Sequence, residues 1–303
     1  MTLNTKKIVF IVGPTAIGKT KLSIQLAKKL RTEIISCDSR QFYKELKIGT
    51  AAPNKQELSE VKHHFIQHKS IHDNYTINDF LLDFDELVKK YFNDKKYIVL
   101  VGGSNLYLKS IVYGLDNIPT VPDKIRAKLN IEYQNKGIVY MQNKLKKLDP
   151  KYYKNVDLQN HRRIIRALEV SVFTRKPFSS FLSGNDTEKY KNHSIALNLD
   201  RNILYEKINS RVNKMLDNGL IDEVKELLPH EHLNSLNTIG YKEIFKHFNG
   251  ELNFQETIEL IKTNSRRFAK RQLSWLKNNG NHYWLESAES NKNNIEKLFQ
   301  QIF

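Results

Sequence analysis

The first third of the chain carries three short runs of mostly apolar, β-branched residues. These runs span residues 8–12, 33–37 and 97–101, and a similar run returns at 194–199. Because they show little alternation of apolar and polar positions, they predict strands that are buried on both faces, as in a parallel sheet. After the first run, the apolar residues of 21–30 keep mainly to one side of a helix. The pattern therefore predicts an α/β core.

Residues 116–192 have a different character. The strand-like runs stop, prolines recur, and three basic stretches with helical periodicity follow one another. These stretches are 124–135, 138–148 and 162–172. We predict that residues 116–194 form an inserted, all-helical subdomain, whereas 1–115 and 195–303 together form the α/β core.

The first strand leads into Gly13-Pro14-Thr15-Ala16-Ile17-Gly18-Lys19-Thr20, which matches the phosphate-binding pattern G-x-x-x-x-G-K-[ST] and directly precedes the predicted helix. In such a loop the backbone N–H groups surround an anion, the helix N-terminus faces it, and the lysine reaches the outer phosphate. We predict a core like that of phosphate-loop NTPases, a parallel sheet with helices on both faces. All eight residues are expected to bind a diphosphate, with Thr20 as a Mg²⁺ ligand. The loop would bind a diphosphate in the same way whether adenosine or a hydrocarbon is attached to it, so the motif does not identify the substrate.

Two other strand ends are expected to face the same crevice, because ligands bind outside the carboxyl ends of the strands in such a sheet. Asp38 directly follows the second strand and is a candidate general base, although a turn or helix-capping carboxylate would suit the same position. The third strand ends in Gly102-Gly103-Ser104, where ATPases and GTPases commonly place an acidic Mg²⁺ ligand. This difference argues against hydrolysis of a phosphoanhydride. Ser104 has either a structural or a substrate-facing role.

The chain is strongly basic. Its 303 residues include 49 Lys and Arg against 33 Asp and Glu, a formal net charge of +16, and 40% hydrophobic residues suffice for a sizeable core. Such a surplus suggests a polyanionic partner, although a uniformly basic surface has the same balance. Arg162, Arg163 and Arg166 are grouped on one predicted helix, and Arg267 and Arg271 on a later one. Each group is a candidate nucleic-acid contact or a solvated face.

The single cysteine, Cys37, excludes an intramolecular disulfide and a zinc site built from cysteines, which fits a reducing compartment. The apolar run near the N-terminus is too short for a signal peptide, and no segment reaches the roughly 18 apolar residues that a membrane span needs. The sequence therefore predicts a cytoplasmic protein without a membrane partner.

Taken in order, seven segments resemble the tRNA dimethylallyltransferase family, also called tRNA isopentenyltransferases. They are the phosphate loop, Asp38-Ser39-Arg40-Gln41-Phe42-Tyr43, Ile48-Gly49-Thr50-Ala51-Ala52-Pro53, Val101-Gly102-Gly103-Ser104, Arg166-Ala167-Leu168-Glu169-Val170, Arg211-Val212 and Ala269-Lys270-Arg271-Gln272. The resemblance implies transfer of a dimethylallyl group from dimethylallyl diphosphate to the exocyclic amine of the adenosine just 3′ of a tRNA anticodon, tRNA position 37. It also implies Mg²⁺ as cofactor, an inserted domain that grips the anticodon arm, and a monomer.

The resemblance further implies roles for individual residues. Asp38 would accept the proton of the amine, and Lys19, Ser104 and Arg211 would complete the catalytic set. Contacts with tRNA are implied for Asp38, Ser39, Arg40, Gln41, Ser104, Arg126, Arg162, Arg163, Ile164, Ile165 and Arg166, and the basic character of the later helix adds Arg267 and Arg271. Three positions depart from the family pattern, since Ile17, Ala52 and Ser104 stand where serine, lysine and threonine are usual.

Two other functions remain open. A kinase acting on a small molecule or a nucleotide would use the same loop and Asp38, and ATP-dependent phosphoryl transfer would reveal it. A non-catalytic RNA-binding protein would keep the loop for a structural nucleotide, and its RNA processing would survive Lys19→Ala and Asp38→Ala.

Overall fold

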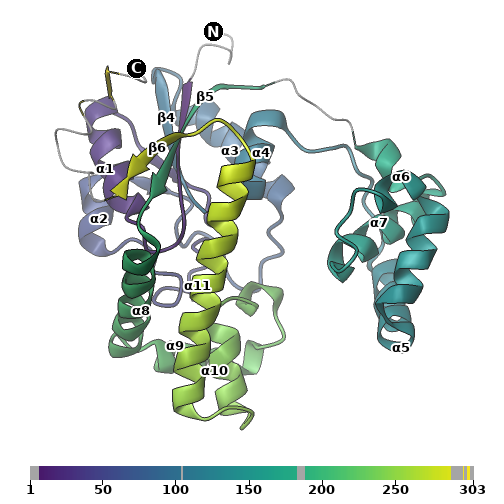
Figure 1. Cartoon of the computed structure of the whole chain (residues 1–303). Helices are drawn as coiled ribbons and strands as arrows, with labels where there is room; N and C mark the ends of the chain where they lie inside the picture. The colour runs from purple at the N-terminus through teal and green to yellow at the C-terminus, as the bar shows by residue number, and fades with distance from the viewer. Residues whose placement is uncertain (1–6, 104, 183–187, 288–295, 297–298, 301–303) are drawn as a thin grey trace. The chain divides into compact units, whose positions relative to one another are not determined.

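A computed structural model describes residues 7–103, 105–182, 188–287, 296 and 299–300 of the chain. The chain divides into two compact units (Figure 1). One unit comprises Met1–Val112 and Glu188–Phe303, and the other comprises Tyr113–Thr187. The second unit is thus an insertion into the first.

The first unit is built around a six-stranded sheet in which all strand pairs are parallel. In spatial order the strands are β3 (His63–His64), β2 (Ile34–Ser36), β4 (Tyr97–Val101), β1 (Lys7–Val12), β5 (Lys191–Asn198) and β6 (Tyr283–Glu286). Four strands confirm the prediction from apolar runs, whereas β3 and β6 carry no such run and were not predicted. Because β5 already pairs at Lys191 with Lys7, the segment 188–194 belongs to the first unit and not to the insertion.

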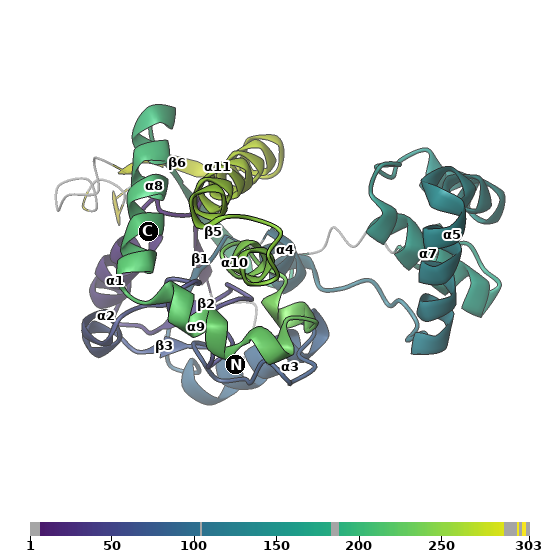
Figure 2. The same ribbon diagram turned by 90° about the horizontal axis from the view of Figure 1, so that it is seen from below.

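The chain leaves the centre of the sheet in both directions. From β1 it passes through α1 (Lys19–Leu30) to β2, and from β4 it passes through α4 (Asn105–Tyr113) and the insertion to β5 on the other side of β1. Parallel crossovers are right-handed, so opposite directions place their helices on opposite faces. Figure 2 shows α1 and α4 on the two sides of the sheet. Ligands bind where the strand order reverses, outside the carboxyl ends, and here that point lies at β1 and β4.

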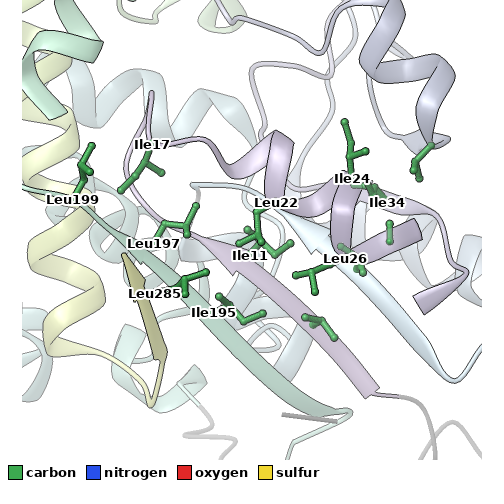
Figure 3. Close-up of a cluster of buried hydrophobic side chains, with 14 of the residues drawn as sticks. Ile11, Ile17, Leu22, Ile24, Leu26, Ile34, Ile195, Leu197, Leu199 and Leu285 are labelled. Atoms are coloured by element: carbon green, nitrogen blue, oxygen red, sulfur yellow. The ribbon is translucent and has the colours of Figure 1, made fainter. Parts of the chain in front are cut away.

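A core of apolar side chains lies between α1 and one face of the sheet (Figure 3). Leu22 and Leu26 of α1 share it with Ile11 of β1 and Ile195 of β5, and all four side chains are fully buried. Burial of one apolar stripe supplies most of the stability of a short amphipathic helix. This core fixes α1 on the sheet and therefore fixes the loop that joins β1 to α1.

Further helices complete the first unit. They are α2 (Lys55–Glu60), α3 (Ile77–Tyr91), α8 (Arg201–Asp217), α9 (Leu220–Glu226), α10 (Tyr241–Phe248) and α11 (Phe254–Asn278), with short 3₁₀ helices at Leu228–His230 and Asn234–Leu236. A capping box fixes the start of α3 at Thr76 and that of α11 at Asn253. A second apolar core gathers around the buried Tyr241. Within the described ranges, no helix is long and apolar enough to cross a lipid bilayer.

The second unit is helical in its described part. Its elements are α5 (Asp123–Leu148), α6 (Pro150–Tyr153), α7 (His161–Thr174) and a 3₁₀ helix at Phe178–Phe181. Gly137, with a φ of 73°, interrupts α5 between the two stretches that the sequence predicts as separate helices. Leu145 of α5 and Leu168 of α7 are fully buried in the core of this unit. The insertion therefore has a hydrophobic core of its own.

Candidate active site

The loop between β1 and α1 has the backbone shape of an anion site. Its φ angles are positive at Gly13, Ala16 and Gly18, and Gly18 caps α1 without any side-chain hydrogen bond. The first-turn N–H groups of α1 are therefore left for a ligand. No acidic residue lies in this first turn, so no side chain of the helix itself competes with an anion.

Ile17 holds the loop against the protein core. Its side chain is 1% exposed and lies among the core residues of Figure 3. Its carbonyl oxygen accepts a 2.5 Å hydrogen bond from Ser287 Oγ. A side chain at Gly13 would come within 3.2 Å of Ile17 Cγ2 and of the Leu197 carbonyl oxygen, which explains why glycine starts the loop. The isoleucine is thus tolerated because its side chain points away from the anion site.

The side chain of Lys19 folds back over the start of the phosphate loop. Its Nζ donates hydrogen bonds of 3.1 and 2.9 Å to the carbonyl oxygens of Gly13 and Pro14. Burial lowers the pKa of Lys19 to about 8, while nearby Asp38 raises this pKa and nearby Arg211 lowers it. Lys19 is therefore electrostatically coupled to one carboxylate and to a second cation.

Asp38 sits just beyond the carboxyl end of β2, after the buried Cys37. Its Oδ1 accepts a 3.0 Å hydrogen bond from the backbone N–H of Arg40, and its own N–H donates to Ser36 Oγ. Among the described residues Oδ2 has no hydrogen-bond partner. One oxygen of Asp38 therefore shapes the turn, as one of the two sequence interpretations expects, and the candidate role of general base would fall to the other oxygen.

Arg211 comes from α8, far away in the sequence. Its Nη2 donates a 3.3 Å hydrogen bond to the carbonyl oxygen of Thr50. Burial lowers the pKa of Arg211, and Asp38 opposes this effect by raising the pKa. The guanidinium thus lies beside Asp38 and Lys19 and can neutralise the charge of an anion bound there.

Glu223 of α9 holds the segment that precedes Thr50. Its carboxylate accepts hydrogen bonds from three consecutive backbone N–H groups, those of Lys47, Ile48 and Gly49, at 2.8–3.1 Å. The hydroxyl of Tyr241 donates to the same carboxylate at 2.6 Å. Glu223 and Tyr241 were not predicted from the sequence. The only signal was the run Ile48–Pro53, one of the seven segments of the family resemblance, which does not identify its partners.

A Mg²⁺ ion would find few protein ligands at this site. The side chain of Thr20 is half-buried at the start of α1, and the described residues contain no group of three or more His, Cys, Asp or Glu able to hold a metal. Magnesium accepts one or two protein oxygens when substrate phosphates and water supply the others. The Thr20 hydroxyl fits that limited role.

A cavity of about 510 Å³ opens beside the phosphate loop. It is lined by Ala16 of the loop and by five residues of α8, which are Glu206, Lys207, Ser210, Arg211 and Lys214. These positions recur at helical spacing on a single face of α8. Three of the lining side chains are cationic, which suits the reception of a polyanion.

A buried carboxylate organises two arginines of the insertion. Glu169, 1% exposed, accepts two hydrogen bonds from Arg126, at 2.6 Å from Nε and 2.8 Å from Nη2, and another from Arg166 Nη1. Both guanidiniums remain partly exposed, with side-chain exposures of 52% for Arg126 and 39% for Arg166. Because two guanidiniums share one carboxylate, the cluster has a net positive charge. Its hydrogen bonds also fix the positions of both guanidiniums.

Comparison with known proteins shows the family to which the chain belongs. The family model described as IPP transferase matches residues 41–279. The tRNA dimethylallyltransferase of Christiangramia forsetii is 50% identical over 97% of this chain and 98% of its own length. The chain belongs to the IPP transferase family. The tRNA dimethylallyltransferase of Flavobacterium johnsoniae is 43% identical over 98% of both chains.

Solved structures from this family have the same fold. A tRNA isopentenylpyrophosphate transferase from Bacillus halodurans is 35% identical, with a TM-score of 0.73 over 98% of this chain and 95% of that one. A eukaryotic dimethylallyltransferase acting on tRNA is 27% identical, with a TM-score of 0.81 over 97% of this chain and 78% of that one. The resemblance inferred from seven sequence segments is thereby confirmed.

The described residues include three of the four catalytic residues expected from the sequence. Lys19, Asp38 and Arg211 come together, with Thr20 adjacent along α1, whereas Ser104 lies outside the described residues. Ser39 is half-buried. Gln41 donates from Nε2 to the carbonyl oxygens of Thr50 and Ala51, both at 3.2 Å, so it supports the loop that also contacts Arg211.

Arg40 is engaged within the fold. Its guanidinium donates to the carbonyl oxygens of Asn234, Ser235 and Asn237 at 2.8–3.3 Å. These bonds engage both Nη atoms of the guanidinium within the fold. Among the expected tRNA contacts, Arg40 therefore has a structural role in this structure.

The remaining expected contacts divide by burial. Arg162, Arg163, Arg267 and Arg271 are exposed. By contrast, Ile164 and Ile165 are 0% and 5% exposed and pack in the core of the insertion. The side chains of Ile164 and Ile165 are therefore core residues that position the neighbouring arginines, and are not themselves available to RNA.

Proposed function

We propose that this chain transfers a dimethylallyl group from dimethylallyl diphosphate to the exocyclic amine of the adenosine 3′-adjacent to a tRNA anticodon, at tRNA position 37. One observation carries the proposal. Lys19, Asp38 and Arg211 converge beside the uncapped N-terminus of α1 in a chain that is 50% identical to a tRNA dimethylallyltransferase. The site thus combines an anion cradle with a carboxylate able to accept a proton.

The first chemical requirement is departure of diphosphate. The bond between the allylic carbon and the diphosphate oxygen breaks more easily when the negative charge that develops on the oxygen is neutralised. Lys19, Arg211 and the N–H groups of the loop would bind that charge. Mg²⁺, bound through Thr20, would add a further positive charge when present. The same cationic groups and N–H donors would also hold the diphosphate after its bond to the allylic carbon has broken.

The second requirement is a competent amine. The lone pair of the adenine N6 is delocalised into the ring, so the nitrogen attacks the allylic carbon best when a base accepts one of its protons. Oδ2 of Asp38 is positioned for this role, since Oδ1 is held by the backbone of Arg40. In the balance of the reaction, the N6–carbon bond forms, the carbon–oxygen bond breaks, and the N6 proton passes to Asp38.

The third requirement is access of the base to the crevice. A base stacked within an RNA loop must be unstacked before it can reach an active site. The exposed arginines of the insertion, together with the fixed pair Arg126 and Arg166, supply positive charge for binding the RNA backbone. We propose that the enzyme acts on tRNA in the cytoplasm and as a monomer.

Mass spectrometry of an unmodified anticodon-arm RNA tests the proposal. The RNA is incubated with the protein, dimethylallyl diphosphate and Mg²⁺, and a matched reaction contains the Asp38→Asn variant. We expect one added prenyl group on the adenosine next to the anticodon, and its loss in the variant. Transfer of phosphate from ATP to a small acceptor, without prenylation of RNA, would establish the kinase alternative instead.

A further inference from the structure

Gln272 is a buried polar residue that the proposed chemistry does not use. It lies in α11 and is 6% exposed, whereas its neighbours Lys270 and Arg271 are exposed. Within the segment Ala269-Lys270-Arg271-Gln272 it is thus the polar side chain that points into the protein. Buried amides are retained where both halves of the group have hydrogen-bond partners.

Both halves of the Gln272 amide are paired, and each with a different loop. Its Oε1 accepts a 3.1 Å hydrogen bond from the backbone N–H of Thr15, in the middle of the phosphate loop. Its Nε2 donates a 3.1 Å hydrogen bond to the carbonyl oxygen of Gly103, in the turn after β4. The side chain therefore joins the loop of β1 to the loop of β4 at the carboxyl end of the sheet.

The turn after β4 is shaped to receive this side chain. A Cβ atom at Gly103 would lie 2.3 Å from Nε2 of Gln272 and 3.7 Å from the carbonyl oxygen of Gly13. Real Cβ atoms do not approach so closely, so a side chain at position 103 would displace Nε2 of Gln272, which donates to the Gly103 carbonyl oxygen. Glycine at position 103 and glutamine at position 272 are therefore a matched pair.

We propose that Gln272 is a positioning residue that holds the phosphate loop in its diphosphate-binding shape. The hydrogen bond from the Thr15 N–H ties the middle of the loop to the side chain of Gln272. Ala16, with a φ of 64°, then follows in the left-handed region. A loop held in its bound shape pays less ordering entropy when the anion binds. The inference rests on the proposed function, because it takes diphosphate as the ligand.

Binding of inorganic pyrophosphate, measured by titration calorimetry, tests the proposal without requiring turnover. Gln272→Met keeps the approximate size of the side chain but loses both hydrogen bonds, so we expect the dissociation constant to rise about tenfold. Gln142→Met is the matched control. Gln142 also donates to a backbone carbonyl, that of Leu158 at 2.8 Å, but it lies in the insertion, so its substitution should leave pyrophosphate binding unchanged.

A second variant acts on the same contact from the other side. Gly103→Ala displaces the amide without changing Gln272, and it should weaken pyrophosphate binding to a similar extent. In a Gln272→Ala background the added methyl group has room, so the second substitution should add little to the effect of the first. If Gln272→Met does not fold, Gly103→Ala carries the test alone.

Steady-state kinetics separate positioning from simple stabilisation. Gln272→Met should raise the KM for dimethylallyl diphosphate about tenfold and leave the KM for tRNA unchanged. Unaltered pyrophosphate binding with only a lower melting temperature would overturn the inference, and so would a rise in the KM for tRNA alone. Wild-type protein that binds pyrophosphate but transfers no prenyl group would refute the proposed function, while the binding comparison would still decide the role of Gln272.

Discussion

The hydroxyl of Tyr241 donates a 2.6 Å hydrogen bond to the carboxylate of Glu223. The two residues also enclose Gly49, because a Cβ there would lie 2.4 Å from the Tyr241 ring and because Glu223 accepts the Gly49 N–H. The next residue, Thr50, accepts the hydrogen bond from Arg211. A contact between α9 and α10 is thereby coupled to a cation of the active site.

Tyr241→Phe should destabilise the first unit by about 1.5–3 kcal/mol, the range for a lost hydrogen bond to a charged group. The transfer rate should also fall severalfold, because the carbonyl oxygen of Thr50 that orients Arg211 becomes less fixed. Urea unfolding and steady-state kinetics measure the two effects. Tyr205→Phe, at a hydroxyl that pairs with exposed Arg201, should change the unfolding free energy by less than about 0.5 kcal/mol. Equal effects of the two variants would contradict the role of Glu223.

Asp38→Asn should lower kcat about 10²- to 10⁴-fold, the range for loss of a general base. The asparagine keeps an oxygen that can accept from the Arg40 N–H, so the turn and the melting temperature should be preserved. Rapid-quench measurement of RNA prenylation gives the rate. Activity within threefold of the wild type would exclude Asp38 as the base.

Lys19 should make pyrophosphate binding dependent on pH. Its pKa of about 8 means that the ammonium is charged below pH 8 and loses its charge as the pH rises above that value. The affinity for pyrophosphate should therefore fall above about pH 8. Titration of the Lys19→Met variant over the same pH range gives the contribution of the ligand's own ionisation. If the two pH profiles are parallel, Lys19 does not titrate in this range.

Lys19 should also make the free energy of unfolding depend on pH. This free energy should rise over the pH range in which the affinity for pyrophosphate falls. The pKa of Lys19 is lowered from 10.5 to about 8 in the folded state, so between these pH values the unfolded chain binds more protons. The contribution of Lys19 to the free energy of unfolding therefore increases as the pH rises through this window. The free energies of unfolding of wild type and Lys19→Met are measured at pH 7.5 and at pH 10. From the lower to the higher pH, the wild type should gain stability relative to the variant.

Arg166 and Arg40 should differ in their effect on tRNA binding. Substituting Arg166 with glutamine should reduce the slope of log K against log salt concentration by about one, as expected for the loss of one phosphate contact. Arg40→Gln should leave the slope unchanged and lower the melting temperature, because Arg40 donates to backbone carbonyls of residues 234–237. A lower slope for Arg40→Gln would show that this side chain does reach the RNA.

The parts of the fold that could be predicted from the sequence are those with a local signal. The apolar run before Gly13 and the periodicity after Lys19 both come from contiguous residues, so β1, α1 and the loop between them follow from pattern alone. The strand β3 has two residues, and β6 is a four-residue edge strand with exposed Tyr283 and Trp284. Such strands exist because neighbouring strands offer hydrogen-bonding partners, which no local pattern reports.

The candidate site residues also divide into those with a local sequence signal and those without one. Lys19 and Asp38 could be predicted because each follows a strand whose end is defined locally. Arg211 could be assigned only through resemblance, since nothing within α8 reveals that Thr50 and Asp38 lie nearby. Contact of Arg40 with RNA was implied by the family resemblance, and only the tertiary structure shows the three backbone carbonyl oxygens that accept its hydrogen bonds.

The insertion leaves the first unit at Val112 and returns at Glu188, and the backbone N–H of Lys189 donates a 2.8 Å hydrogen bond to the carbonyl oxygen of Val112. The two points at which the inserted segment joins the first unit are therefore adjacent, like the ends of a surface loop. During evolution such a segment can be lengthened, shortened or exchanged while β4 and β5 keep their register beside β1. Selection can then act on the inserted unit without changing the residues that we propose for the chemistry.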